Sequence, residues 1–334
     1  MTMPLQVVVT DHGFPNLNIE RETLEPIQAT VTEFQCKHAE EVIAAARHAD
    51  AIMTQWAPIT AEVIAELQQC RVIVRYGIGT DNVDLEAAAK KGIPVVNVPD
   101  YALDEVADHT MTLLLASARK LVPVMKQIQT GAWITNPCRP LFSLAGRTLG
   151  LAGFGNIARK VAHRAQAFGM QVSAYDPYVE SAQFAAAGVS QVDWEALLQE
   201  SDLISIHLPL TKDTQHLFND QAFCLMKPGA YLVNTSRGGV IRTGDLIAAL
   251  QRGRLAGAGL DVLEQEPIAP DSPLLSMPEV LLTSHCAWYT EDALDRLKQL
   301  AATEIVRVFS GEQPKHIVNR KWLSQHGHMR RRDL

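Results

Sequence analysis

The chain has few cysteines, no excess of positive charge and no long apolar run. Its 334 residues include five cysteines, none in a CxxC pair: Cys36, Cys70, Cys138, Cys224 and Cys286. An odd number at such wide spacing argues against a disulfide framework and a zinc site, so we expect free thiols and no bound metal. A net charge of −7 provides no general basic field, which argues against nucleic acid or an anionic membrane as partner.

Targeting and membrane signals are also missing. The N-terminus lacks the order of a signal peptide, and no apolar run is long enough to cross a bilayer. We therefore expect a cytoplasmic protein. The basic cluster MRRRDL, at 329–334, has the composition of a solvated tail.

What the chain does have is a repeated alternation of strand and helix patterns, over a length that suggests about two domains. Short apolar runs such as QVVVTD, AIMTQW and RVIVRYG alternate with helical patterns over the first hundred residues. The alternation begins again at RTLGLAGFG, with six strand candidates up to VLLTSH. Such alternation predicts α/β architecture with parallel, helix-covered sheets, here as two Rossmann-like domains.

Two long helices are expected to carry the chain between the domains, at about Asp104 to Gln129 and Glu291 to Phe309. The second follows the completed second sheet and could return to the first domain. The sequence therefore predicts an NAD-binding domain at 104–289, inserted into a discontinuous, flavodoxin-like substrate domain made of 1–103 and 290–334.

A glycine turn opens the second series of strands. Gly153, Gly155 and Ala158 form a G-x-G-x-x-A arrangement between an apolar strand and a helix, and the next strand ends at Asp176. The glycines permit a tight turn and a close approach to a pyrophosphate, while Asp176 suits the adenosine ribose hydroxyls and repels a 2'-phosphate. This context favours NAD over NADP.

Polar residues follow three later strands, at Arg237, at Asp261 with Glu266 in the loop behind it, and at His285. Ligands of doubly wound sheets bind beyond such strand ends. Arg237 could hold a carboxylate and polarise a carbonyl, and His285, with Glu266 stabilising its imidazolium form, could supply a proton. The set predicts reduction of a 2-oxo acid by NADH, with Asp261 near the nicotinamide carboxamide.

The sequence resembles the D-isomer-specific 2-hydroxyacid dehydrogenase family over nearly its whole length. The likeness rests on VRYGIGTDNVD, NVPDYALDEVADHT, GFGNIA, HLPLTKDT, MKPGAYLVNTSRGG, GLDVLEQEP and TSHCAWY. It implies Arg237, Glu266 and His285 as catalytic residues, a cleft that closes between the domains, a small 2-oxo or 2-hydroxy acid substrate and a homodimer. The implied cofactor contacts are Thr110, Gly153, Phe154, Gly155, Asn156, Ile157, Asp176, His207, Leu208, Pro209, Thr214, Thr235, Ser236 and Asp261.

The resemblance also implies that the loop Arg75, Tyr76, Gly77, Ile78, Gly79 meets the substrate. TSHCAWY and VRYGIG are most like the branch of the family that contains the C-terminal binding proteins and phosphoglycerate dehydrogenase-like enzymes, in which Arg75 and Trp288 would line the pocket. The alternative for Trp288 is that it packs on the core at a helix start. Ser284 stands where the family usually has proline.

Several alternatives stay open on the sequence alone. One is an NAD(H)-sensing, corepressor-like interaction protein with little turnover, which would tolerate loss of His285 and Glu266. Others concern the substrate: 3-phosphoglycerate, glyoxylate or hydroxypyruvate, or an acid with an apolar tail that would suit Tyr76 and Trp288. The physiological direction is also open.

Overall fold

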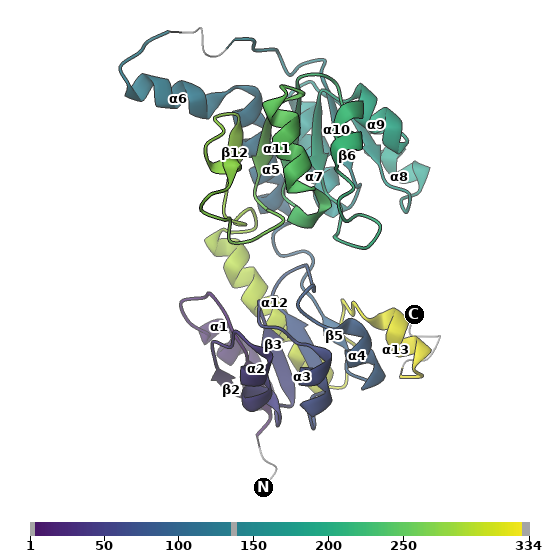
Figure 1. Cartoon of the computed structure of the whole chain (residues 1–334). Coiled ribbons are helices and arrows are strands. Elements are labelled where there is room, and N and C mark those ends of the chain that lie inside the picture. Colours follow the sequence, from purple (N-terminus) through teal and green to yellow (C-terminus); the bar gives the residue numbers. More distant parts are fainter. Residues whose placement is uncertain (1–3, 135–138, 329–334) are drawn as a thin grey trace. The chain divides into compact units, whose positions relative to one another are not determined.

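The computed structural model describes residues 4–134 and 139–328, and the chain divides into two compact units. One unit comprises Met1–Ala102 and Thr290–Leu334, and the other comprises Leu103–Tyr289 (Figure 1). Cys138 and the basic end at 329–334 lie outside the described residues. Within the described ranges, the remaining four cysteines are free and no helix is both long and apolar enough to span a membrane.

The first unit contains a five-stranded parallel sheet with the order β2-β1-β3-β4-β5, the flavodoxin-like order. Val7 of β1 lies opposite Val31 of β2 and Ala51 of β3. The strands are β1 (Gln6–Val9), β2 (Thr30–Glu33), β3 (Ala51–Thr54), β4 (Val72–Arg75) and β5 (Val95–Val96). The helices are α1 (Asn18–Leu24), η1 (Glu25–Ile27), α2 (Ala39–Ala46), α3 (Ala61–Glu66), α4 (Leu85–Lys90), α12 (Glu291–Phe309) and α13 (Arg320–Gln325).

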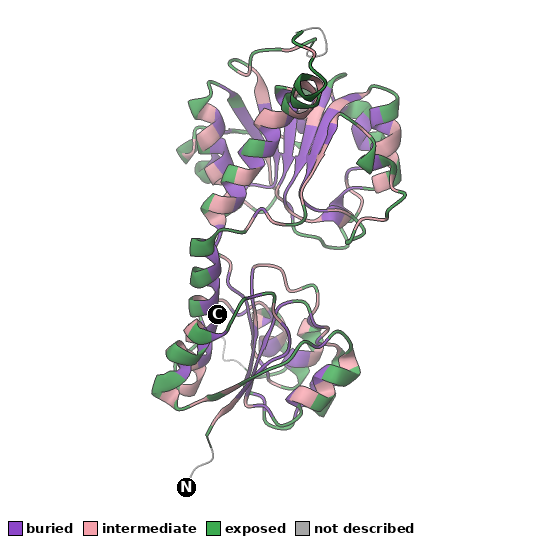
Figure 2. Cartoon of the chain, turned by 90° about the vertical axis from the view of Figure 1, so that its left-hand side faces the viewer, coloured by how far each residue is buried: buried purple, intermediate pink, exposed green. Residues whose placement is uncertain are grey.

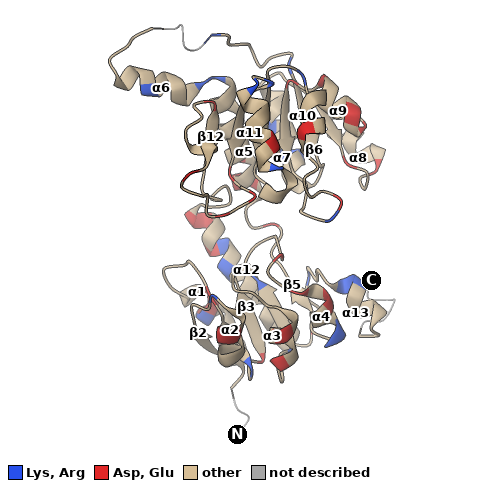
Figure 3. Ribbon diagram, in the orientation of Figure 1, with Lys and Arg blue, Asp and Glu red and all other residues tan. Residues whose placement is uncertain are grey.

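The C-terminal segment completes the first unit. The Val318 N–H donates to the Val95 carbonyl at 2.9 Å, and the Val95 N–H donates to Asn319 Oδ1 at 2.9 Å. Helix α12 begins at an N-cap, Thr290, with Glu291 and Asp292 in its first turn and Arg307 in its last (Figure 3). This distribution of charge complements the helix dipole.

The second unit contains a seven-stranded parallel sheet with the order β12-β11-β10-β9-β6-β7-β8. The order reverses between β6 and β9, as in a doubly wound nucleotide-binding sheet. The strands are β6 (Thr148–Ala152), β7 (Gln171–Tyr175), β8 (Ser190–Gln191), β9 (Leu203–Ile206), β10 (Ala230–Asn234), β11 (Leu255–Leu260) and β12 (Val280–Leu282). Both sheets are parallel, which confirms the predicted fold class.

Helices cover both faces of this sheet, and two apolar clusters fill the spaces between them (Figure 2). One cluster contains Phe218 and Phe223, and the other contains Phe154 and Val161. The helices are α5 (Leu103–Ala118), α6 (Leu121–Gln129), α7 (Asn156–Ala167), α8 (Ser181–Ala186), α9 (Trp194–Glu200), α10 (Asp220–Leu225), η3 (Gly238–Val240), α11 (Thr243–Gln251) and η4 (Pro273–Leu275).

Two local predictions were wrong. The single helix expected from Asp104 to Gln129 is two helices, because Lys120 adopts a left-handed φ of 50°. Pro123 has no N–H to donate and would clash with the preceding turn of a continuous helix, so the sequence carried this signal. The strand β8 was also missed, since its two residues are exposed and have no apolar pattern.

Candidate active site

The glycine turn leaves β6 at the point where the strand order reverses. Gly153 has a φ of +95°, and a Cβ there would lie 2.7 Å from the His207 carbonyl oxygen. Gly155 precedes the first residue of α7, and a Cβ there would meet no atom of the described chain within 4 Å. Gly155 therefore has open space in front of the helix N-terminus, where a phosphate could approach the backbone amides.

Asp176 is fixed against this turn. Its Oδ2 accepts the Phe154 N–H at 2.9 Å, and its Oδ1 accepts the Tyr178 N–H at 3.0 Å. The Phe154 side chain points away into the core, where it is fully buried and stacks on Phe184 with ring centroids 4.5 Å apart. Only the backbone of Phe154 can therefore meet a ligand, and the carboxylate of Asp176 lies beside it.

The loop after β9 contributes a neutral histidine. The His207 ring lies 2.9 Å from Ser205 Oγ, and burial lowers its pKa to about 4. Leu208 is buried in the core. Thr214 donates to the Pro209 carbonyl at 2.6 Å, which closes the loop on itself. At physiological pH the His207 ring offers hydrogen bonds without charge.

Threonines join α5 to the end of β10. The Thr110 hydroxyl donates to the Val106 carbonyl at 2.7 Å, so the Thr235 hydroxyl, 2.7 Å from Thr110 Oγ1, is the donor between the two. Ser236 donates through both its N–H and its hydroxyl to Asn234 Oδ1. Thr235 and Ser236 thus hold the strand end that leads into Arg237.

The backbone just after Arg237 packs closely against the loop that carries Glu266, and a glycine, Gly238, makes this contact possible. A Cβ on Gly238 would lie 1.9 Å from the backbone of Leu263, so no other residue fits there without a shift of the chain. The Leu263 N–H donates to Glu266 Oε1 at 2.9 Å, and Arg237 Nη1 donates to the Ser236 carbonyl at 2.7 Å. Gly238 was not singled out from the sequence, although the RGG pattern contains it.

His285 and Glu266 form a direct pair, with Nδ1 of the histidine 2.8 Å from Oε2 of the glutamate. Both side chains are partly exposed, 45% and 39% respectively. Burial would raise the pKa of Glu266, but the hydrogen bonds from His285 and Leu263, with the charges of His285 and Arg237, lower it overall. The carboxylate is therefore ionised at neutral pH and holds the imidazole from one side.

The backbone of His285 is left-handed, with a φ of 55°, which is unusual for a residue other than glycine. Its N–H donates to the Asp261 carbonyl at 2.8 Å. Left-handed backbone at a non-glycine residue is costly, and such residues gather at functional sites. The conformation presents the imidazole at the strand end instead of continuing β12.

Asp261 holds the loop around His285 with its side chain. Asp261 is 2% exposed; its Oδ1 accepts the Thr283 hydroxyl at 2.6 Å and the Cys286 N–H at 3.0 Å, and its Oδ2 accepts the Ala287 N–H at 3.0 Å. Hydrogen bonds from within the chain thus occupy both oxygens. A nicotinamide carboxamide that donates to Asp261, as expected, would have to use oxygens that already accept these hydrogen bonds. Thr283, which no sequence pattern marks as functional, is part of the same arrangement.

The loop expected to meet the substrate lies in the first unit, at the end of β4. Gly77 has a φ of +120°, and its carbonyl and that of Ile78 accept hydrogen bonds from the Val98 N–H and Asn97 Nδ2. Tyr76 differs from expectation. Its side chain is 1% exposed and donates to Glu20 Oε1 at 3.1 Å, so it supports the loop from the core and offers no ring to a pocket.

Trp288, the other aromatic side chain expected in the pocket, lies in the second unit and is half-buried. Its ring meets Tyr289 edge-on, with ring centroids 5.5 Å apart.

A sequence model described as D-isomer specific 2-hydroxyacid dehydrogenase, NAD binding domain, matches residues 111–287. The chain belongs to this family. It is 40% identical over 267 residues to a glyoxylate reductase of Korarchaeum cryptofilum, covering 79% of this chain and 80% of the relative. It is 38% identical over 282 residues to a D-3-phosphoglycerate dehydrogenase of Methanocaldococcus jannaschii, covering 84% of this chain and 53% of that protein.

The fold agrees with solved members of the family. A crystal structure of D-lactate dehydrogenase from Aquifex aeolicus, complexed with NAD and lactic acid, has a TM-score of 0.84 and 30% identity over 92% of this chain and 96% of the other. As a D-2-hydroxyacid dehydrogenase, the protein is an oxidoreductase that uses NAD, which confirms the predicted family, enzyme class and cofactor.

Proposed function

We propose that the chain transfers hydride reversibly between NADH and a small 2-oxo acid, with His285 as the acid and base. The observation that carries this proposal is the 2.8 Å contact between His285 Nδ1 and Glu266 Oε2. Arg237 supports it, since its positive charge helps to lower the pKa of Glu266 and must therefore lie close to the pair. A cation, a carboxylate and an imidazole then surround one reacting carbonyl.

The residues around the glycine turn fit NAD. The open space at Gly155 and the N-terminus of α7 suit the pyrophosphate, and the fixed Asp176 carboxylate suits the ribose hydroxyls. When bound, NADH supplies the hydride that reduces the carbonyl carbon. We accordingly assign the unit Leu103–Tyr289 as the cofactor domain and the other unit as the substrate domain.

The proton passes through one atom of His285. Glu266 is ionised and can only accept, so Nδ1 of His285 carries a hydrogen toward it, and Nε2 faces the substrate. In reduction, Nε2–H donates to the developing alkoxide; in oxidation, neutral Nε2 takes the hydroxyl proton. Arg237 binds the substrate carboxylate through its planar fork and polarises the carbonyl.

The substrate is proposed as a class: a small 2-oxo acid such as glyoxylate or hydroxypyruvate, with 3-phosphoglycerate as the oxidisable alternative. The named activities of the relatives support glyoxylate and 3-phosphoglycerate. Arg75, Gly77, Ile78, Gly79 and Trp288 stay predictions for substrate contacts. Replacing Arg75 by methionine should raise KM more than it lowers kcat.

The deciding experiment follows NADH oxidation with glyoxylate, pyruvate, hydroxypyruvate, its phosphate and phenylpyruvate. His285→Asn is the preferred variant, because asparagine tolerates left-handed backbone and leaves the loop intact. We expect kcat to fall by about 10²–10⁴-fold. His216→Asn is the matched control, since His216 also has a left-handed φ, of 53°, and pairs with Glu264.

Equal rates in the wild type and His285→Asn would reject the assigned acid and base. Tight NADH binding with no turnover on any acid would favour an NAD(H)-sensing interaction protein instead.

We also propose a homodimer, formed by a second copy of the chain against α6. This helix has no buried residue, and Leu121, Met125 and Ile128, at i, i+4 and i+7, are 48%, 53% and 43% exposed on one side. Such a stripe can pair with its own copy across a two-fold axis. Met125→Glu should give monomers in light scattering, while Leu275→Glu, at an equally exposed position, should not. Unchanged mass for Met125→Glu would reject this interface.

A further inference from the structure

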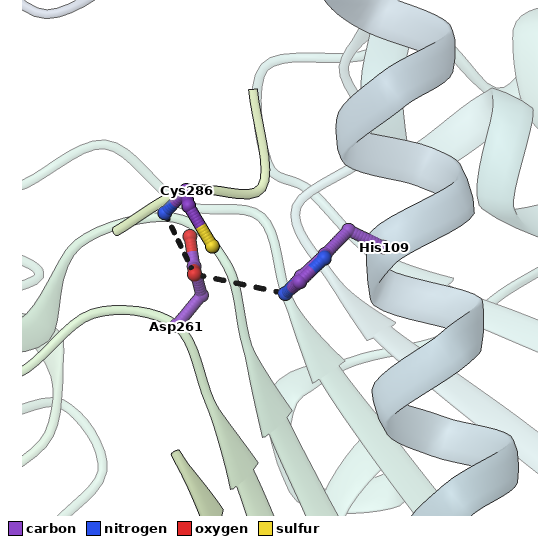
Figure 4. A group of neighbouring side chains, drawn as sticks. All are labelled: His109, Asp261 and Cys286. Atoms are coloured by element: carbon purple, nitrogen blue, oxygen red, sulfur yellow. Dashed lines mark hydrogen bonds and ion pairs between the residues drawn. The ribbon is translucent and has the colours of Figure 1, made fainter. Parts of the chain in front are cut away.

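Three side chains that can bind metal converge beside the proposed acid and base. His109 lies on α5, Asp261 follows β11, and Cys286 lies in the loop after β12, all within the second unit (Figure 4). One donor atom from each lies within 4.8 Å of the other two, and His109 Nε2 is 3.6 Å from Asp261 Oδ1. The side chains of His109 and Cys286 both point toward the carboxylate of Asp261.

The donors are an imidazole nitrogen, a carboxylate oxygen and a thiol sulfur. Magnesium and calcium prefer oxygen ligands, whereas a sulfur and an imidazole together favour zinc. A thiolate and a carboxylate would balance the double charge of the cation, and three protein ligands leave a fourth position for water. The cysteine spacing argued against a zinc site in the sequence, but these donors come from three separate elements that only the fold brings together.

Binding would require small local changes. Zinc–ligand bonds of about 2.0–2.3 Å bring neighbouring donors in a tetrahedron to less than about 4 Å, so the trio must contract. His109 would release its 3.0 Å contact with the Thr283 hydroxyl, while Thr283 keeps its hydrogen bond to Asp261. Cys286 is partly exposed, so its sulfur can turn toward an arriving ion.

We propose that His109, Asp261 and Cys286 form an inhibitory site for a thiophilic divalent cation, with Zn²⁺ as the probe. Asp261 holds the loop of His285 through the N–H groups of Cys286 and Ala287. A metal bound to both Asp261 and Cys286 would pull on this loop and compete with the cofactor contact proposed for Asp261. The reaction itself needs no metal, so the site goes beyond the proposed function, and only its inhibitory effect depends on that function.

Binding is tested without activity, by titrating chelator-treated full-length protein with Co²⁺ and recording absorption. A thiolate ligand gives a charge-transfer band in the near ultraviolet. We expect the band in the wild type and in Cys224→Ser, which removes an exposed free cysteine elsewhere, and its loss in Cys286→Ser. His109→Gln should weaken Co²⁺ binding by at least about 10-fold. A missing band in the wild type, or the same band in Cys286→Ser, overturns the site.

Inhibition is tested by initial rates at increasing Zn²⁺ and NADH. We expect inhibition that EDTA reverses and NADH weakens, with the inhibition constant raised by at least about 10-fold in Cys286→Ser and unchanged in Cys224→Ser. Equal inhibition of the two variants, or a cobalt band without inhibition, overturns the inhibitory role. A protein without turnover on any acid would reject the proposed function, while the cobalt band would still report on the site.

Discussion

The first strands of the two sheets lead to very different ends. Strand β6 runs into Gly153 and Gly155, which leave open space before a helix. Strand β1 runs into Asp11, which is 4% exposed and whose carboxylate accepts the N–H groups of Gln55 and Trp56 at 3.1 and 2.6 Å. It also accepts the hydroxyls of Thr10 and Thr54.

Both strands lie at a reversal of strand order, where doubly wound sheets bind ligands. In the first unit, the buried carboxylate fills that place and takes up the backbone amides that an anion would need. In the second unit, Gly153 and Gly155 have no side chains, so the corresponding place after β6 stays open. The comparison shows that topology alone does not make a nucleotide site, because two or three residues at the turn decide whether it is open.

The largest expected effect comes from Gly153→Val, which closes the open turn. With a φ of +95° and a Cβ 2.7 Å from the His207 oxygen, valine should lower the free energy of unfolding by about 3 kcal/mol or more and abolish NADH binding. Gly253→Val is the control, since its φ is +66° but no described atom lies near. Urea unfolding measures the stability of both variants, and NADH fluorescence measures their cofactor binding. An equal loss of stability in the two variants would contradict the close contact at Gly153.

Asp11→Asn should destabilise the turn after β1, which the Asp11 carboxylate fills. The amide presents a donor where the carboxylate accepted backbone N–H groups, so we expect a loss of about 2–3 kcal/mol in stability. NADH affinity should not change, because the turn after β1 is already filled by the Asp11 carboxylate. Asp50→Asn, whose side chain accepts one N–H from Gln6, should cost less. Weakened NADH binding with unchanged stability would overturn this contrast.

Acidification should affect the two units in opposite directions. Burial lowers the pKa of His207 from 6.5 to about 4. The free energy of unfolding of the second unit should therefore decrease as the pH falls through this range, by up to about 2 kcal/mol because the ring is partly exposed. Burial raises the pKa of Glu20 in the first unit, so the cost of burying its ionised form diminishes as the pH falls through the folded pKa toward 4.5.

Hydrogen exchange at pH 7 and pH 5 should therefore show greater loss of protection in β6 and β9 than in β1 and β3. His207→Asn should reduce this difference. A loss that is equal in both sheets would mean that these buried groups do not govern the response.

Gly155→Ala should have the smallest effect on the fold and a clear effect on the cofactor. The φ of −74° suits alanine and the space is open, so stability should stay within about 0.5 kcal/mol. NADH should bind about 10-fold more weakly, a cost of about 1.4 kcal/mol, because the methyl group separates pyrophosphate and backbone. Gly244→Ala, in the first turn of α11 with equally open space, is the control.

The fold class and the cofactor could be predicted from the sequence because their signals are local. Strand and helix alternation gave the fold class, and the turn around Gly153 gave the cofactor. Tyr76 could not be placed from its neighbours in the chain, since its direction depends on Glu20, which lies 56 residues away in the sequence. The group of His109, Asp261 and Cys286 depends on the packing of α5 against the ends of β11 and β12, which no spacing reveals.

The C-terminal segment has a consequence for the order of events during synthesis. The unit Leu103–Tyr289 is continuous and can complete its contacts as the chain leaves the ribosome, whereas the first unit waits for Val318 and Asn319 to reach β5. Until then Glu20, fully buried in the finished unit, lacks Lys298, whose Nζ lies 3.6 Å from it. The segment at 1–102 is made first but can complete its unit only after the segment from 290 onward has been made, so we expect a truncation near residue 300 to harm this unit before the nucleotide-binding one.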